Sequence, residues 1–408
     1  MGTKKVRRES AKFGLTFAAF LALCVILLCA LVSFAGNGFE VARAEDIRVE
    51  GAGVRPQLFF ACELDTPSLQ LLIADPTIIA NLKDVNAGVA LALNDLSPAR
   101  AQVVRELNQA GIPMVAWIVL PMKQGYYLNA YNASGADRQF TAFEKWTADY
   151  GLKWVAVGLD MEPNFSEFSD ARTHKLRLAA TLLRRSFNGA GVQRARQAYS
   201  ALIRRIQSDG YAAETYQMFF LADERRVHST VLERLLGIVD VTPDTPGWKD
   251  EVPPQWQAYN EEVLMVYTSF NHQADAAPVW EYGPEAQALA VGSTARSGDA
   301  AIDAKYPPLN WDELSRNLIV ESHFSRLVGV YSLEGCVREG YLSRFKTLDW
   351  NQPVVISADA LRRATRFRRV IEDILWTASR LPYFMLGFLV AVTTLIWWRR
   401  SRKQKLTA

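Results

Sequence analysis

The 408-residue sequence has no marked excess of charge of either sign, with 46 basic and 43 acidic side chains. This balance excludes the strong positive field of a nucleic-acid-binding domain, so we expect no nucleic-acid partner. An apolar content of 50% likewise excludes a disordered chain. Histidine is scarce, and no histidine pair has the spacing of a metal site, so no metal or other cofactor is expected. The four histidines are His174, His228, His272 and His323.

Cysteine is also scarce. Cys24 and Cys29 lie in an apolar run near the N-terminus and are interpreted as inert packing residues. Cys62 lies on the first predicted strand and Cys336 follows the last, and these strands are neighbours only if the sheet closes on itself. Outside the cytoplasm such a pair can be oxidised, so a disulfide and two separate buried thiols are the two alternatives.

Charge is absent from two long runs, residues 13–35 and 381–398. A helix rises about 1.5 Å per residue, so the first run spans the roughly 30 Å hydrocarbon layer of a bilayer. The second run ends in a tryptophan pair of the kind found at membrane interfaces. The sequence therefore predicts two transmembrane helices that flank one large domain.

The charges outside the two runs predict the topology. Five basic residues and one acidic residue precede the first run, and the basic sequence RRSRKQK follows the second. Basic flanks stay on the cytoplasmic side, so both termini are expected in the cytoplasm and the central domain outside it. As an alternative, the signal-peptidase-like sequence at residues 42–44 would release the first helix and leave the second as the anchor.

These boundaries divide the chain into seven parts. The expected parts are a cytoplasmic tail (1–12), a transmembrane helix (13–35), a linker (36–54), a barrel domain (55–352), a basic juxtamembrane helix (353–380), a transmembrane helix (381–398) and a cytoplasmic tail (399–408). The arginines of residues 362–369 are interpreted either as a solvated face near anionic headgroups or as a docking surface for a protein partner.

The central domain repeats one sequence pattern: a helical stretch ends at a glycine, and a short apolar run follows it. Gly111, Gly151 and Gly210 occupy this position, where a left-handed residue closes a helix. Continuously apolar strands that alternate with helices predict a parallel sheet covered on both faces.

Eight such strands are predicted, which is the number that closes a TIM-like (β/α)8 barrel, with an open doubly wound sheet as the alternative. No glycine-rich phosphate loop follows the first strand, which disfavours the open sheet. The predicted strands are 58–64, 88–94, 114–120, 154–162, 213–220, 239–242, 263–270 and 328–333. The segment 272–308 is interpreted as a lid or rim over the mouth of the barrel.

The ends of the predicted strands are rich in carboxylates, and in a barrel the active face is built there. Asp160 and Glu162 lie two apart at the end of one strand, so their side chains share a face. Two carboxylates held close cannot both ionise easily, so one can donate a proton near neutral pH. Glu63, Asp95 and Glu334 end other strands, whereas Asp65 is expected to cap a helix.

The run VAVGLDMEP resembles the fourth-strand signature of barrel glycoside hydrolases, especially the Asp-x-Glu ending of the chitinase-like family 18 and the lysozyme-like family 25. The resemblance covers about ten residues. It implies Glu162 as the general acid and Asp160 as its support. Family 18 has a further aspartate two residues before Asp160, where this chain has Gly158.

Aromatic and amide side chains surround the same strand ends, and pyranose rings need both flat apolar faces and hydrogen bonds. With Glu63 and Asp95, the predicted substrate-binding residues are Trp117, Tyr126, Tyr127, Asn129, Tyr131, Tyr267, Asn271 and Tyr331. Capping or pairing with arginine is the alternative role for Asp160 and Glu162, and Glu334 is either a second catalytic group or a solvent-facing side chain.

Three functions remain open. The first is a membrane-anchored glycoside hydrolase that acts on an extracytoplasmic or envelope polysaccharide. The second is a carbohydrate-binding or assembly module without turnover, which Gly158 favours. The third is a scaffold whose two membrane helices contact protein partners that the sequence does not identify.

Overall fold

The computed structural model describes residues 45–406 except 52, 54, 165–180, 183, 243–260 and 297–299. The predicted first transmembrane helix, residues 13–35, lies outside the described residues. The last predicted cytoplasmic residues are helical as far as Leu406.

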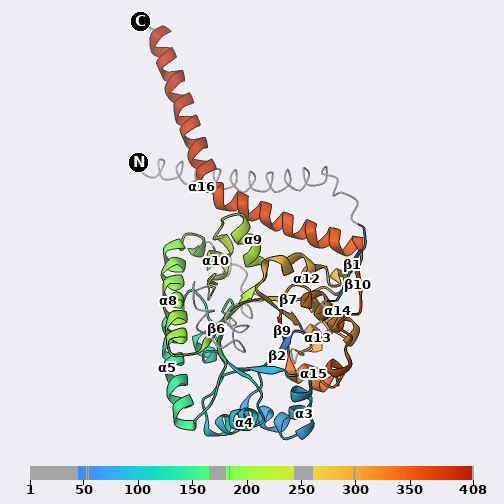
Figure 1. The fold of residues 1–408 in the computed structure, drawn as a ribbon. Helices are drawn as coiled ribbons and strands as arrows, with labels where there is room; N and C mark the ends of the chain where they lie inside the picture. The colour runs from blue at the N-terminus through green and yellow to red at the C-terminus, as the bar shows by residue number, and fades with distance from the viewer. Residues whose placement is uncertain are drawn as a thin grey trace.

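Eight parallel strands form a closed barrel (Figure 1). The predicted (β/α)8 architecture is confirmed, and the open sheet is wrong because β2 pairs with both β3 and β9. The central strands are almost wholly buried, as expected where helices cover the outside and side chains fill the inside. The strands are β2 (Gln57–Cys62), β3 (Gly88–Ala92), β4 (Met114–Ile118), β5 (Ala156–Met161), β6 (Ala212–Met218), β7 (Glu262–Tyr267), β8 (Ala288–Gly292) and β9 (Leu327–Tyr331).

One predicted strand is wrong. Residues 239–242 are irregular, and the missing strand is β8, inside the segment predicted as a lid. Val239 and Val241 are buried and resemble a strand in sequence, but the carbonyl oxygen of Val241 accepts a hydrogen bond from the side chain of Gln217. β8 has the sequence ALAVG, whose alanines and glycine are weak strand formers, so its signal was missed.

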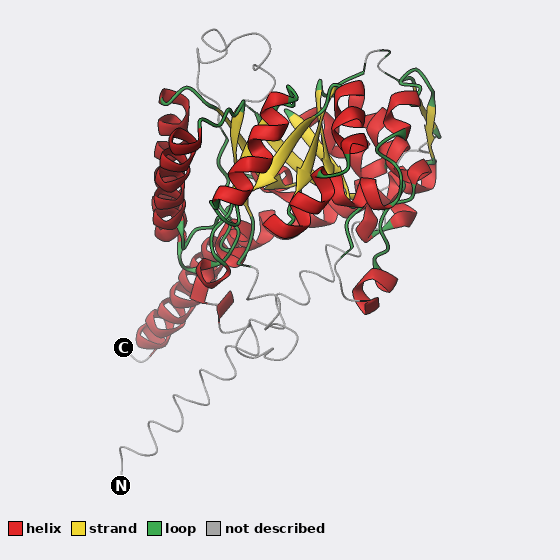
Figure 2. Ribbon diagram, turned by 90° about the horizontal axis from the view of Figure 1, so that it is seen from below, coloured by secondary structure: helices red, strands yellow, loops and turns green. Residues whose placement is uncertain are grey.

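The helices surround the barrel (Figure 2). Gly111, Gly151 and Gly210 have φ of 78°, 63° and 90°, which confirms their predicted left-handed conformation. The helices are α2 (Thr66–Ile73), α3 (Pro76–Asp84), α4 (Pro98–Gln109), α5 (Ala133–Tyr150), α8 (Gly189–Ser208), α9 (Phe220–Arg226), α10 (Val231–Leu236), α12 (Ala277–Tyr282), α13 (Ala300–Lys305), α14 (Trp311–Ser322) and α15 (Leu333–Arg338).

The segment that follows Asp65 forms two helices, α2 and α3. Asp65 caps α2 as expected, and its carboxylate accepts a hydrogen bond from the backbone N–H of Ser68 at 2.9 Å. The chain then breaks before Pro76, because proline disfavours a helical residue ahead of it, and Asp75 caps α3.

The C-terminal helix α16 (Ala358–Leu406) follows a small antiparallel ribbon of β1 (Ile47–Val49) and β10 (Val354–Ile356). Its first half packs against α9 and α12, and its apolar second half leads away from the barrel (Figure 1). Pro382 lies inside the helix, where a proline removes a hydrogen bond and favours a bend. Within the described residues, α16 is the helix long and apolar enough to cross a membrane.

Candidate functional site

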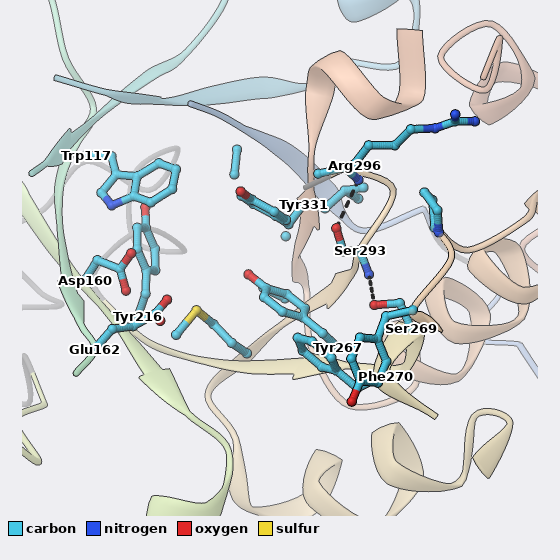
Figure 3. Close-up of a pocket in the computed structure, with 18 of the residues that line it drawn as sticks. Trp117, Asp160, Glu162, Tyr216, Tyr267, Ser269, Phe270, Ser293, Arg296 and Tyr331 are labelled. Carbon is cyan, nitrogen blue, oxygen red and sulfur yellow. Dashed lines mark hydrogen bonds between the residues drawn. The ribbon is translucent and has the colours of Figure 1, made fainter. Parts of the chain in front are cut away.

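A cavity of about 270 Å³ opens at the carboxyl end of the barrel, where the strands terminate. Asp160 and Glu162 lie on one wall, and Tyr267 and Tyr331 lie on the facing wall (Figure 3). Trp117 from β4 lies beside the two acids. The cavity therefore combines paired carboxylates with flat aromatic faces.

The acids are held by the end of β5. Asp160 is the fifth residue of this buried strand, and Glu162 follows directly after it. The backbone of Leu128 pairs with both residues, because its N–H donates to the carbonyl oxygen of Asp160 at 2.9 Å and its own carbonyl accepts from the N–H of Glu162 at 3.1 Å. Both side chains thus reach the cavity from a fixed backbone.

The alternative role of the two acids was capping or pairing with arginine, and residues 165–180, which follow them in the chain, lie outside the described residues. Within the described part of the chain, no basic side chain is paired with Asp160 or Glu162. The buried indole N–H of Trp117 faces the carboxylate of Asp160, and this interaction lowers the pKa of Asp160 by less than burial raises it. Neither group forms a hydrogen bond of regular geometry, and a polar ligand atom beside them would supply one.

Burial and mutual repulsion change the protonation of the acids. Burial, followed by the charge of Glu63, raises the pKa of Glu162 from 4.5 to about 7. Burial, followed by the charges of Glu162 and Glu63, raises the pKa of Asp160 well above its ordinary value. The pair of carboxyl groups on Asp160 and Glu162 therefore retains protons near neutral pH, as proton donation to a leaving group requires.

Glu63 lies behind the aromatic wall and positions it. The hydroxyl of Tyr331 donates to Glu63 at 2.7 Å, and the hydroxyl of Tyr127 lies 3.5 Å from the other carboxylate oxygen. Tyr126 packs edge-on against Tyr127 with ring centroids 4.9 Å apart and has a positive φ of 63°, which is strained for a bulky residue. Tyr267 stacks on Tyr331 at 5.6 Å.

Besides Glu63 and Tyr126, four predicted substrate-binding residues do not line the cavity. The carboxylate of Asp95 accepts hydrogen bonds from Thr66 and Arg100, so it ties α2 to α4. Asn129 is buried and accepts from the N–H of Tyr131, and Tyr131 packs against the guanidinium of Arg185 at 4.6 Å. Asn271 is exposed in the turn after β7.

Glu334 and the two cysteines also differ from expectation. Glu334 lies in the first turn of α15 and does not line the cavity; it is half-buried, with one carboxylate oxygen buried and the side chain beside Cys62. Cys62 and Cys336 are free buried thiols, and the disulfide is wrong. The sulfur of Cys336 faces the hydroxyl of Thr294 at 3.6 Å, whereas that of Cys62 faces Glu334.

Part of the cavity was missed in the sequence. Its outer wall is formed by residues that come after β7 and β8, and β8 was not predicted from the sequence. Ser293 there donates its N–H to the hydroxyl of Ser269 at 2.9 Å (Figure 3). The missed lining residues include Tyr216, Ser269, Phe270, Ser293, Arg296, Asp303 and Tyr306. Among the described residues, no group of three histidine, cysteine or acidic side chains is arranged to hold a metal ion.

The strand pairing and the cavity define the chain as a (β/α)8-barrel protein with an acidic cavity at the carboxyl end. The sequence matches no protein-family model and no curated protein.

Several solved barrels are similar in structure. The glycoside hydrolase domain of PgaB (BpsB) from Bordetella bronchiseptica is 10% identical, with a TM-score of 0.42 over 72% of this chain and 99% of that one. D-allulose 3-epimerase from Methylomonas sp. is 11% identical, with a TM-score of 0.34 over 79% and 100%. ScGas2 is 9% identical, with a TM-score of 0.33 over 79% and 71%. These likenesses concern the barrel fold.

Proposed function

We propose that this chain is a membrane-anchored glycoside hydrolase that acts on an extracytoplasmic or envelope polysaccharide. One observation carries the proposal: Glu162 lies in an aromatic-walled cavity without a basic partner among the described residues, and its pKa is raised to about 7. Such a carboxyl group is protonated in part at neutral pH and can donate that proton to a glycosidic oxygen. The apolar half of α16 supplies the proposed anchor.

In this mechanism, a sugar ring packs between Trp117 and the facing pair Tyr267 and Tyr331. Glu162 protonates the glycosidic oxygen as the bond to the sugar breaks, and a water molecule adds to the anomeric carbon and releases the proton that restores Glu162. Asp160 supports it by holding a polar group of the substrate beside the indole N–H of Trp117. Glu63 orients the tyrosines and repels a charge on Glu162, so it keeps the acid protonated.

A carbohydrate-binding module without turnover is the second candidate, and Gly158 favours it. A side chain added at Gly158 would meet the Tyr216 ring, with 2.5 Å to its hydroxyl oxygen. Tyr216 thus fills the space into which the further aspartate of the family 18 signature would extend from this position. The cavity keeps its aromatic walls whether or not the acids act.

The test is a panel of envelope and extracellular polysaccharides, assayed for turnover and binding with the full chain. We expect the wild type to release reducing ends and Glu162→Gln to lose about 100-fold or more of the rate. Glu106→Gln changes an exposed glutamate on α4 and should have wild-type activity. Binding without turnover would favour the second candidate, and neither binding nor turnover would favour a scaffold.

A further inference from the structure

The first half of α16 has a face that packs on the barrel. Leu361, Arg368 and Leu375, spaced seven residues apart, are buried on this face. Arg368 donates to the carboxylate of Asp223 at 2.8 Å and to that of Glu285 at 2.7 Å. This helix is therefore fixed to the flank of the barrel formed by α9 and α12.

The opposite face of the same half-helix is apolar and exposed. Phe367, Val370 and Ile374 lie three and four residues apart, which places them on one stripe, and they are 54%, 43% and 50% exposed. The exposed arginines Arg366 and Arg369 lie along one side of this stripe. Exposed residues of this stretch also include Arg363, which donates to the carbonyl oxygen of Gln273, and Asp373.

An apolar stripe with arginines beside it is typical of a helix that lies in the interface of a membrane. Here the stripe continues along the same helix into the apolar half that is proposed to cross the bilayer. In Figure 1, the first half of α16 extends across one flank of the ring of strands, and the second half turns away from it. The two halves can therefore contact the surface and the interior of one bilayer.

We infer that the face formed by Arg366, Phe367, Arg369, Val370 and Ile374 binds the surface of an anionic bilayer. The inference depends on the proposed membrane anchor and not on catalysis. It places the α9–α12 flank against the lipid headgroups.

The test measures how deep single fluorescent labels on the full chain lie in the bilayer of a vesicle. Cys24→Ala and Cys29→Ala remove two native cysteines, and Cys62 and Cys336 can stay because they are buried, so that only the introduced cysteine is labelled. A fluorophore is attached to Val370→Cys, and a lipid that carries a headgroup-level quencher is included. We expect strong quenching with phosphatidylcholine mixed with phosphatidylglycerol, and weaker quenching with phosphatidylcholine alone. Each arginine near an anionic surface favours binding about fivefold, so R366E/R369E should lower the surface-bound fraction sharply.

Two control labels separate the outcomes. Leu71→Cys lies on α2, which packs with α3 and α4 far from α16, and should not be quenched. Leu389→Cys lies in the apolar half and should be quenched by a label deep in the bilayer. Quenching at position 389 without quenching at position 370 would overturn the surface-binding inference and leave the anchor in place. Equal quenching at position 370 in the two kinds of vesicle would have the same meaning. No quenching at 389 would overturn the anchor as well, and turnover on polysaccharide would be unaffected by either result.

Discussion

At the scale of single residues, the ring of Tyr216 lies directly against the backbone of Gly158 inside the barrel. Gly158 lies opposite Trp117 on β4 and Glu214 on β6, and the Tyr216 ring covers its α-carbon. Tyr216 also packs edge-on against Trp117 at 6.1 Å and donates to Glu214 at 2.8 Å. This pair therefore sets the floor of the cavity beside Asp160.

Gly158→Ala should lower the free energy of unfolding by about 1–3 kcal/mol, because the new methyl group has no room beside a ring held on several sides. Urea denaturation measures the change. In a Tyr216→Ala background the same substitution should cost much less, since the ring is gone. An equal cost in both backgrounds would show that the two residues do not compete for space.

Glu162 should make the stability of the fold depend on pH. Its carboxyl keeps its proton up to about pH 7 in the folded chain, but an unfolded glutamate releases it near 4.5. The folded state binds more protons in this window, so the free energy of unfolding should fall as pH rises from 4.5 to 7, by roughly 3 kcal/mol. Glu162→Gln should be less sensitive to pH, and an unchanged pH dependence would contradict the buried acid.

The alternation of side chains along a strand was enough to predict that Asp160 and Glu162 face the same way. It was not enough for Asp95 or Glu334, because both lie just beyond a strand where the chain turns. There, side-chain direction depends on contacts with distant residues. Asp95 turns toward Arg100 on α4, and Glu334 turns inward beside Cys62.

At the scale of elements, α16 depends on one buried ion pair. The guanidinium of Arg368 also lies over the Tyr282 ring at 4.2 Å and donates to the backbone of Glu281. Arginines 362–369 were interpreted as a solvated face or a docking surface. Arg368 does not fit either interpretation, because both require exposed arginines and Arg368 is buried against α9 and α12.

Arg368→Ala should lower the free energy of unfolding by about 3–5 kcal/mol, because it leaves Asp223 buried without its cation. Thermal or urea unfolding of the full chain in detergent measures this loss. Arg369→Ala is the matched control and should change stability by about 0.5 kcal/mol or less. Equal effects of the two substitutions would show that α16 is not held by Arg368.

At the scale of the whole molecule, the number of predicted strands indicated barrel closure even though one strand was misplaced. A short apolar run between helical stretches is a local pattern, so the strands can be counted in the sequence. The place of α16 on the barrel could not be predicted, because Arg368 and Asp223 are 145 residues apart and their pairing arises only when the barrel is formed.

The central claim is that Glu162 gives its proton to the departing sugar oxygen. A leaving group that departs as a stable anion needs no proton, so it isolates this role. Once the substrate sugar is known from the panel, kcat/KM of wild type and Glu162→Gln is measured on the unactivated oligosaccharide and on its dinitrophenyl glycoside. We predict a loss of about 100-fold or more on the first and a far smaller loss on the second. Equal losses on both substrates would contradict the claim.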